Sequence, residues 1–251
     1  MAELKNLDKL NIHVKERIEP YCREMIEIHG DNLKSICVYG SSTGVDFVQG
    51  KSNINLLIIM ERIDPPDLKK SLSIVKKGMK RDIVAPLMLT VDYMKTSSDV
   101  FPIEFLEMKG NYILIYGLDL LKDLKIEDNN LRLECEEQLK GGLVRMYQTY
   151  LEVGLNEKRI SELMAHSITS FFPVMRNILR LRGEAPPLKK NEIIRRISSI
   201  SSVNSNILDQ VLELKNTGKT KGNLEKLFGD YLEEIERLTV FIEDVKRDKK
   251  V

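Results

Sequence analysis

The chain has 251 residues, which is enough for one large domain or for two domains of ordinary size. Its 39 Lys and Arg residues nearly balance 38 Asp and Glu residues, so no overall field favours nucleic acid or an anionic membrane, although local patches are still allowed. No apolar run is long enough to span a membrane, and residues 1–10 lack the apolar core of a signal peptide. Because the three cysteines are widely spaced, we expect a cytoplasmic protein without disulfides or a zinc site.

The first half of the chain mixes helical and strand patterns. Residues 3–29 carry apolar side chains at helical spacing, and Pro20 is expected to break or restart this helix before Gly30 ends it. Apolar runs predict five strands, at residues 35–40, 54–60, 86–91, 102–108 and 112–116. The last two flank a short turn and are expected to pair as a hairpin. Another helix is expected at residues 66–79, with one apolar face formed by Leu68, Leu72, Val75 and Met79. These elements predict an α+β unit in which helices pack against a small mixed sheet.

The second half of the chain is helical almost without interruption. Helices are expected at residues 130–153, 156–182, 189–200, 204–216 and 223–247. Pro173 is expected to kink the second of these helices. Helices of this length with short connections pack as a bundle. We therefore predict two domains, an α+β domain of residues 1–127 followed by an all-α helical bundle of residues 128–251.

The segment with the most chemical information is residues 35–60, SICVYGSSTGVDFVQGKSNINLLIIM. An apolar strand runs into Gly40-Ser41-Ser42, and after a polar connector Ser52-Asn53-Ile54-Asn55 opens a second apolar strand. This layout resembles the nucleotidyltransferase superfamily, which has the DNA polymerase β-like fold and in which Gly-Ser follows one strand and Asp-x-Asp begins the next. An ordinary β-turn-β unit, with Asn and Gly chosen for the turn, is the alternative interpretation.

The order of domains also resembles a known layout. A strand-rich unit followed by a helical bundle is similar to the kanamycin- and streptomycin-modifying nucleotidyltransferases, in which the second domain helps to hold the acceptor substrate. The sequence motifs of this resemblance lie within residues 35–117, and the bundle resembles those proteins by architecture alone.

The resemblance implies nucleotide-binding roles for Gly40, Ser41, Ser42 and Ser52. Gly40 would let the backbone approach a phosphate closely. Ser41 would offer a hydroxyl and an N–H donor at the start of a turn or helix. We therefore expect the phosphates of a nucleoside triphosphate to lie beside this turn.

The same resemblance implies metal-binding roles for positions 53 and 55. Two acids at i and i+2 on a strand point the same way and can reach one pair of Mg²⁺ ions, which favour carboxylate oxygens. Here the two positions are Asn53 and Asn55, which keep a carbonyl acceptor but lack the negative charge. The expected third acid is absent from strand 86–91, and Glu104 is the nearest substitute, one strand late in chain order. Glu104 could equally be a partly buried structural acid.

We therefore predict a nucleotidyltransferase-superfamily protein with a degenerate metal site. It would bind a nucleotide or interact with a protein partner or a second copy of itself, with catalysis impaired or lost. The alternative is an active Mg²⁺-dependent enzyme that transfers a nucleoside monophosphate to a small-molecule or macromolecular acceptor. In that case Asn53 and Asn55 would be weak ligands assisted by Glu104, or by Asp46 or Asp82.

A second alternative concerns the bundle. Arg159 and His166 have the loose spacing of HEPN-type ribonucleases, in which the histidine serves as acid or base and the arginine stabilises the developing charge. A half-buried structural histidine explains the same spacing. Several cations could also form a face that binds phosphate or RNA, or simply a solvated helix face: Arg176, Arg180, Arg182, Lys189, Lys190, Arg195 and Arg196. No aromatic residues alternate with these cations to stack on bases, so we do not expect a nucleic-acid partner.

Overall fold

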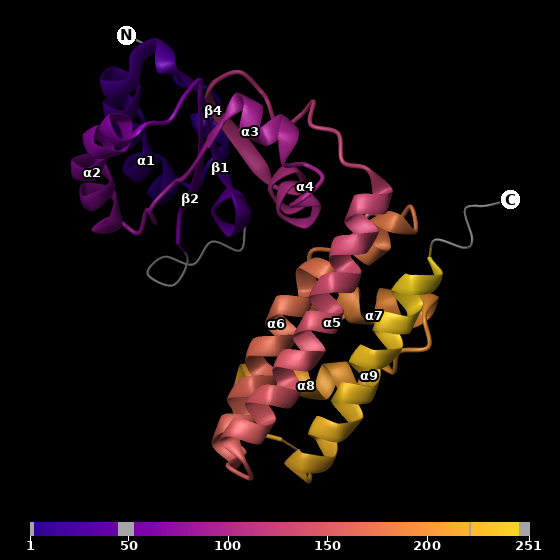
Figure 1. Ribbon diagram of the computed structural model, residues 1–251. Helices are drawn as coiled ribbons and strands as arrows, with labels where there is room; N and C mark the ends of the chain where they lie inside the picture. Colours follow the sequence, from indigo (N-terminus) through magenta and orange to yellow (C-terminus); the bar gives the residue numbers. More distant parts are fainter. Residues whose placement is uncertain (1–2, 45–52, 221, 246–251) are drawn as a thin grey trace, which may run out of the picture. The chain divides into compact units, whose positions relative to one another are not determined.

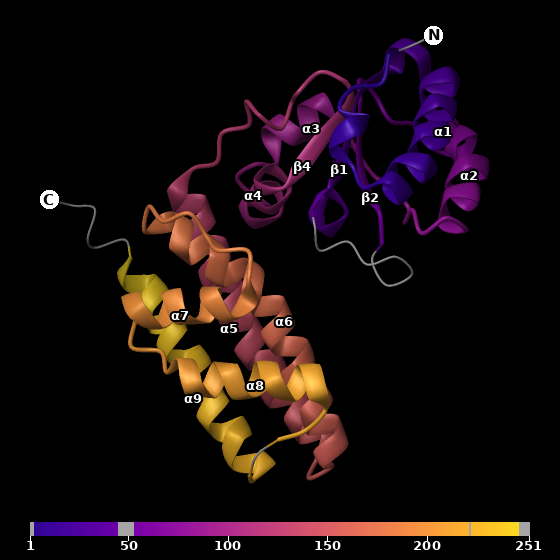
Figure 2. The same ribbon diagram turned by 180° about the vertical axis from the view of Figure 1, so that it is seen from behind.

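The computed structural model describes residues 3–44, 53–220 and 222–245. The chain divides into two compact units, residues 1–126 and 127–251. Figures 1 and 2 show the strands gathered in the first unit and only helices in the second. An α+β fold followed by a helical bundle is thus confirmed.

The first unit is built around a four-stranded mixed sheet in the order β3-β2-β1-β4. Strand β1 pairs antiparallel with both β2 and β4, and β2 pairs parallel with β3. The longer elements are α1 (Ile12–His29), β1 (Leu33–Tyr39), β2 (Asn55–Met60), α2 (Pro65–Met79), β3 (Leu87–Thr90), α3 (Val91–Thr96), α4 (Pro102–Gly110) and β4 (Tyr112–Gly117). Short 3₁₀ turns η1 (Leu7–Lys9), η2 (Gly30–Asn32) and η3 (Gly40–Thr43) complete the unit.

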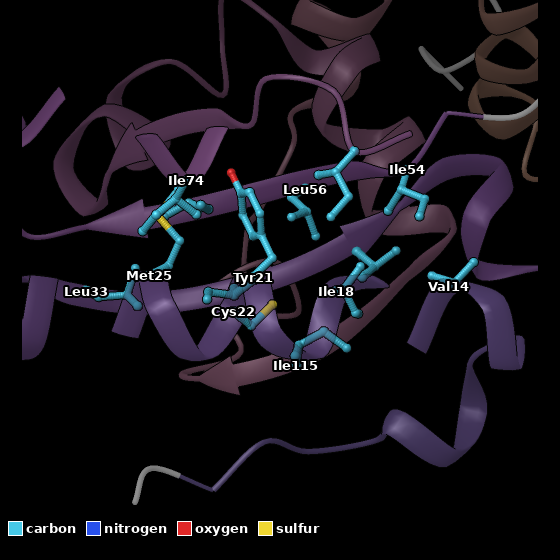
Figure 3. Close-up of a cluster of buried hydrophobic side chains, with 14 of the residues drawn as sticks. Val14, Ile18, Tyr21, Cys22, Met25, Leu33, Ile54, Leu56, Ile74 and Ile115 are labelled. Atoms are coloured by element: carbon cyan, nitrogen blue, oxygen red, sulfur yellow. The ribbon is translucent and has the colours of Figure 1, made fainter. Parts of the chain in front are cut away.

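Each face of the sheet has its own hydrophobic core. Helices α1 and α2 lie side by side over one face, and α3 and α4 lie over the other (Figures 1 and 2). Alternate residues of β2 point to the two cores: Ile58 packs with α1 and α2, whereas Leu57 and Ile59 pack with α3 and α4. Figure 3 shows the first core, with Ile18, Tyr21 and Met25 of α1 against the strands. The sheet is therefore covered on both sides, which explains the continuous apolar sequence of β2.

Pro20 does not break the first helix, contrary to the prediction. It lies inside α1, which runs without interruption from Ile12 to His29 and ends at Gly30. Proline removes one backbone hydrogen bond from a helix interior. Burial of Ile18, Tyr21, Cys22 and Met25 against the sheet outweighs that loss.

The predicted strand 102–108 is wrong, and so is the hairpin that it was expected to form. Residues 102–110 are helix α4, with Pro102 in its first turn and Ile103, Phe105 and Met108 buried. Proline is favoured at the first position of a helix because its missing N–H has no partner there. Strand β4 pairs instead with β1, matching Tyr112 to Tyr39 and Ile113 to Val38.

Helix α2 forms as predicted, but its apolar stripe is turned outward. Leu68, Leu72 and Met79 are 46%, 64% and 63% exposed. The buried side of α2 consists instead of Asp67, Ser71, Ile74 and Gly78, and of the predicted stripe only Val75 packs partly against the first core. The apolar pattern therefore located the helix correctly but not its buried face.

The second unit is a bundle of helices. They are α5 (Asp128–Val153), α6 (Glu157–Leu181), α7 (Lys190–Ile200), α8 (Ser205–Thr217) and α9 (Leu224–Asp244). Helix α6 continues through Pro173, and α5 contacts both α6 and α9. Helix α9 has an apolar side that is buried at Leu227, Tyr231 and Leu238. Within the described parts of both units, no helix is long and apolar enough to cross a membrane.

Candidate functional site

The turn after β1 is held in a left-handed backbone conformation. Gly40 has φ of 76°, which glycine adopts without the steric cost that a β-carbon imposes. Its N–H donates to the Asn111 carbonyl at 3.0 Å, which continues the pairing of β1 with β4 by one residue. The chain then winds into the 3₁₀ turn Gly40–Thr43. The pairing of β1 with β4 therefore sets the residue at which this turn begins.

Asn111, the residue just before β4, forms side-chain hydrogen bonds with the same turn. Its side-chain Nδ2 donates to the Gly40 carbonyl at 3.0 Å, and the Thr43 hydroxyl hydrogen-bonds with its Oδ1. The Thr43 hydroxyl also reaches the Gly40 carbonyl at 2.8 Å. Sequence reasoning missed Asn111 because it was assigned to a hairpin turn. The only available signal was an amide residue immediately before a strand.

The two serines of the turn differ in their surroundings. Ser42 is buried, and its hydroxyl donates to the Tyr39 carbonyl at 3.2 Å. Ser41 is exposed, and its hydroxyl forms no hydrogen bond within the described parts of the chain. Ser41 is therefore available to a ligand, whereas Ser42 holds the turn in place.

Asn55 lies directly beside the turn. It pairs with Tyr39 across the β1–β2 ladder, and a β-carbon placed on Gly40 would stand 3.4 Å from Asn55 Nδ2. Asn55 is half-buried, and Asn53, two residues earlier, is exposed. Because side chains two residues apart on an extended chain point the same way, both amides belong to the α3–α4 side of the sheet. The structure thus brings Gly40, Ser41 and Asn55 together.

No hydrogen bond or ion pair joins Glu104 or Asp82 to this group in the part of the chain that the structure describes. Glu104 is exposed in the first turn of helix α4, and in the described structure no hydrogen bond or ion pair links it to Asn53 or Asn55. Asp82 is held by Arg17 at 2.7 Å. Strand β3 places Leu87, not an acid, opposite Leu57. Asp46 and Ser52 lie outside the described residues.

The donor set beside Gly40 does not suit a pair of magnesium ions. Two neutral amides replace the carboxylates that would offset the charge of the cations. Across residues 3–44, 53–220 and 222–245, no group of three or more His, Cys, Asp or Glu side chains is arranged to hold a metal. What remains at the turn is a glycine, a free hydroxyl and an amide, which can contact a phosphate without a metal.

On the bundle, the sequence pointed to Arg159 and His166. Both are exposed on α6. They are seven residues apart, so they lie on the same side of the helix. Because His166 is exposed, the alternative interpretation of a half-buried structural histidine does not hold. The ribonuclease role of the pair remains a prediction.

A cluster of cations forms where α6, α7 and α8 meet. Lys190 Nζ lies 5.3 Å from the centre of the Phe172 ring, and Lys215 and Arg176 are the cations that act on it. Burial lowers the pKa of Lys190, and the positive charges of Lys215 and Arg176 lower it further. Neighbouring positive charges repel each other, so an anion beside them would be favoured. Sequence reasoning missed Lys215, which lies 25 positions beyond Lys190 and on another helix.

The other members of the predicted basic region are mostly paired. Arg180 donates to Asn177 Oδ1 at 2.8 Å, Arg196 lies 3.5 Å from Glu184, and Lys189 lies 3.8 Å from Glu192. Of this region, Arg176 acts electrostatically on Lys190, together with Lys215 of α8.

The bundle also contains a cavity of about 640 Å³ at the ends of α6, α8 and α9. Its charged lining includes Glu157, Glu162 and Glu225, with Lys158. Three carboxylates make it unsuited to a phosphate group. We therefore do not place the nucleotide there.

Comparisons with known proteins bear on the fold. No protein-family model matches the chain, and no curated protein matches its sequence. The crystal structure of the spectinomycin adenyltransferase AAD(9) from Enterococcus faecialis, with ATP and spectinomycin, is similar with a TM-score of 0.52 and 12% identity. That match covers 88% of this chain and 98% of the adenyltransferase. A nucleotidyltransferase-like protein from Exiguobacterium sibiricum 255-15 matches with a TM-score of 0.40 and 11% identity, over 91% of this chain and 76% of its own. The predicted nucleotidyltransferase-like fold is thus confirmed.

Proposed function

We propose that the first unit binds a nucleoside triphosphate at the turn Gly40–Thr43 and that metal-dependent transfer at this turn is impaired or lost. The proposal depends on one observation. Asn55, an amide, lies beside Gly40, where metal-dependent nucleotidyl transfer needs a carboxylate. The turn itself keeps what phosphate binding needs, a glycine in the left-handed region and the free hydroxyl of Ser41. The similar adenyltransferase structure contains ATP, which supports a nucleotide as the ligand.

The cations of the bundle are a separate candidate for anion binding on the second unit. The positive charges of Lys215 and Arg176 act on Lys190. An anion beside Lys190 would offset this repulsion.

Calorimetric titration of ATP and GTP, with and without Mg²⁺, tests the proposal. We expect saturable binding that does not require Mg²⁺ and that weakens about tenfold in Ser41→Ala, the loss of one charge-assisted hydrogen bond. Ser73→Ala, which changes an exposed serine of α2, is the matched control and should bind like the wild type. Robust Mg²⁺-dependent transfer to an acceptor that vanishes in Ser41→Ala would overturn the impaired-catalysis proposal.

Restoring the acids tests whether the site is degenerate. In the double variant Asn53→Asp/Asn55→Asp we expect Mn²⁺ binding, measured by electron paramagnetic resonance, that the wild-type protein lacks. If the wild type binds Mn²⁺ as tightly as this variant, the metal site is intact and the active-enzyme alternative is favoured. In that case Glu104→Gln should abolish transfer, because Glu104 is the acid assigned to assist the amides.

A further inference from the structure

Helix α2 exposes an apolar ridge. Leu68, Leu72 and Met79 lie at intervals of four and seven residues, so they form a single stripe along the helix, whereas Val75 between them is half-buried against the first core. Leu72 and Met79 are more than 60% exposed and Leu68 is 46% exposed. A row of leucine and methionine side chains that faces solvent is costly unless something covers it.

A row of unpaired lysines runs beside this ridge. At 100° per residue, Lys69, Lys76 and Lys80 lie together on the side of the ridge away from the sheet. All three are exposed, and no ion pair joins them to an acid in the described part of the protein. The two other lysines of α2 are paired, Lys70 with Asp67 at 3.7 Å and Lys77 with Glu24 at 2.8 Å. The only acid within α2, Asp67, is buried, so the outer face carries positive charge alone.

This composition distinguishes among the surfaces that could cover the ridge. A second copy docking through the same helix would bring lysine rows together, which charge repulsion opposes. Cores of protein interfaces favour aromatic residues, methionine and arginine and are poor in lysine. Apart from Met79, this ridge has leucines beside a row of lysines and no aromatic residue or arginine. Helices that lie in the surface of an anionic bilayer combine such an aliphatic stripe with a lysine row.

We propose that α2 is a peripheral docking helix for an anionic lipid surface. Leu68, Leu72 and Met79 would enter the boundary between headgroups and acyl chains. Lys69, Lys76 and Lys80 would remain at the level of the headgroup phosphates. The near-zero net charge of the chain does not oppose this, because attraction of this kind acts within a Debye length of the surface.

Co-sedimentation of the 251-residue chain with lipid vesicles tests the proposal. We expect binding to vesicles of phosphatidylcholine mixed with phosphatidylglycerol, and much weaker binding to phosphatidylcholine alone or at high salt. Leu72→Ser should weaken binding at least about tenfold by removing one inserted side chain. Lys76→Gln should weaken it about fivefold. Leu151→Ser is the matched control, since Leu151 is 82% exposed but lies on α5, and it should bind like the wild type.

Other results would overturn the proposal. Failure to bind mixed vesicles, or equal binding by Leu72→Ser and wild type, removes the lipid role. An oligomer in light scattering that Leu72→Ser dissociates would identify a second copy as the occupant. Binding that needs the lysines but not the leucines would indicate general electrostatic attraction. A thermal melt of each variant in the absence of lipid confirms that the fold is retained.

Discussion

The side-chain amide of Asn55 lies against the α-carbon of Gly40, and a β-carbon there would be 3.4 Å from Asn55 Nδ2. This contact joins the end of β1 to the start of β2 and leaves the exposed hydroxyl of Ser41 beside it. The backbone conformation of Gly40 and the neutral amide of Asn55 can each be changed by a single substitution. The effect of each on nucleotide binding can therefore be measured separately.

Gly40→Ala should destabilise the first unit and weaken nucleotide binding. The 3.4 Å contact is tolerable, but alanine at φ of 76° costs about 1–2 kcal/mol. Gly44→Ala is the matched control because Gly44 has φ of −120° and open space around its α-carbon. We expect the control to be neutral in urea denaturation and in ATP titration. If Gly40→Ala binds ATP like the wild type, the turn is not the nucleotide site.

Local sequence patterns located most elements because apolar spacing and burial agree in them. Strand β2 is an uninterrupted apolar run, and both of its faces are buried. Helix α4 was misassigned because its apolar residues are nearly continuous, and only Pro102 signalled a helix start. The buried face of α2 was misassigned because packing selected small and polar residues, Ser71 and Gly78, to approach α1.

The site was predictable only in part, because its contacts join distant positions. Gly40, Ser41 and Asn55 follow from a motif within one segment of sequence. Asn111 contacts Gly40 across 71 positions, through a strand pairing that no local pattern reveals. Lys215 meets Lys190 through the packing of two helices. Such contacts depend on the fold as a whole and not on neighbouring residues.

The paired glycines of α5 should respond in opposite directions to alanine. A β-carbon on Gly142 would lie 2.6 Å from the Phe171 ring, whereas Gly141 has only the Arg145 guanidinium at 3.5 Å. Gly142→Ala should therefore lose about 1–3 kcal/mol through overpacking. Gly141→Ala should gain up to about 1 kcal/mol from helix propensity. Thermal denaturation of both variants checks this, and Phe171→Leu should relieve the penalty of Gly142→Ala. Similar behaviour of the two variants would contradict close packing of α5 on α6.

Removing one lysine of the bundle cluster should stabilise the protein in a solution without added anions. It should also reduce the stabilisation that an added anion provides. Lys190→Gln relieves repulsion from Lys215 and Arg176. The gain should be below about 1 kcal/mol because the residue as a whole is exposed to solvent, although its ammonium group lies over the Phe172 ring. Wild-type protein should be stabilised by tripolyphosphate in a thermal melt, and Lys190→Gln much less so. Lys189→Gln, next in sequence and paired with Glu192, is the control. An equal tripolyphosphate response in all three proteins would exclude the cluster as an anion site.

His29 should make the stability of the first unit depend on pH. It is 7% exposed, its Nε2 lies 2.9 Å from Ser71 Oγ, and its buried Nδ1 has no hydrogen-bond partner within the described structure. Burial lowers the pKa of His29, and Lys70 lowers it further, against an opposing effect of Asp67. The neutral ring is therefore favoured in the folded state, while the unfolded chain takes up a proton near pH 6.5.

The contribution of His29 is complete above pH 6.5 and is lost as the pH falls below that value. We expect the free energy of unfolding to decrease toward pH 5 by up to about 1.4 kcal/mol per pH unit from this group. In His29→Gln the decrease should be smaller, although the variant is less stable at pH 7. His13→Gln, an exposed position on the same helix, should retain the wild-type pH dependence. Urea denaturation between pH 5 and pH 7 measures all three proteins, and parallel curves for wild type and His29→Gln would show that burial of His29 is not the cause.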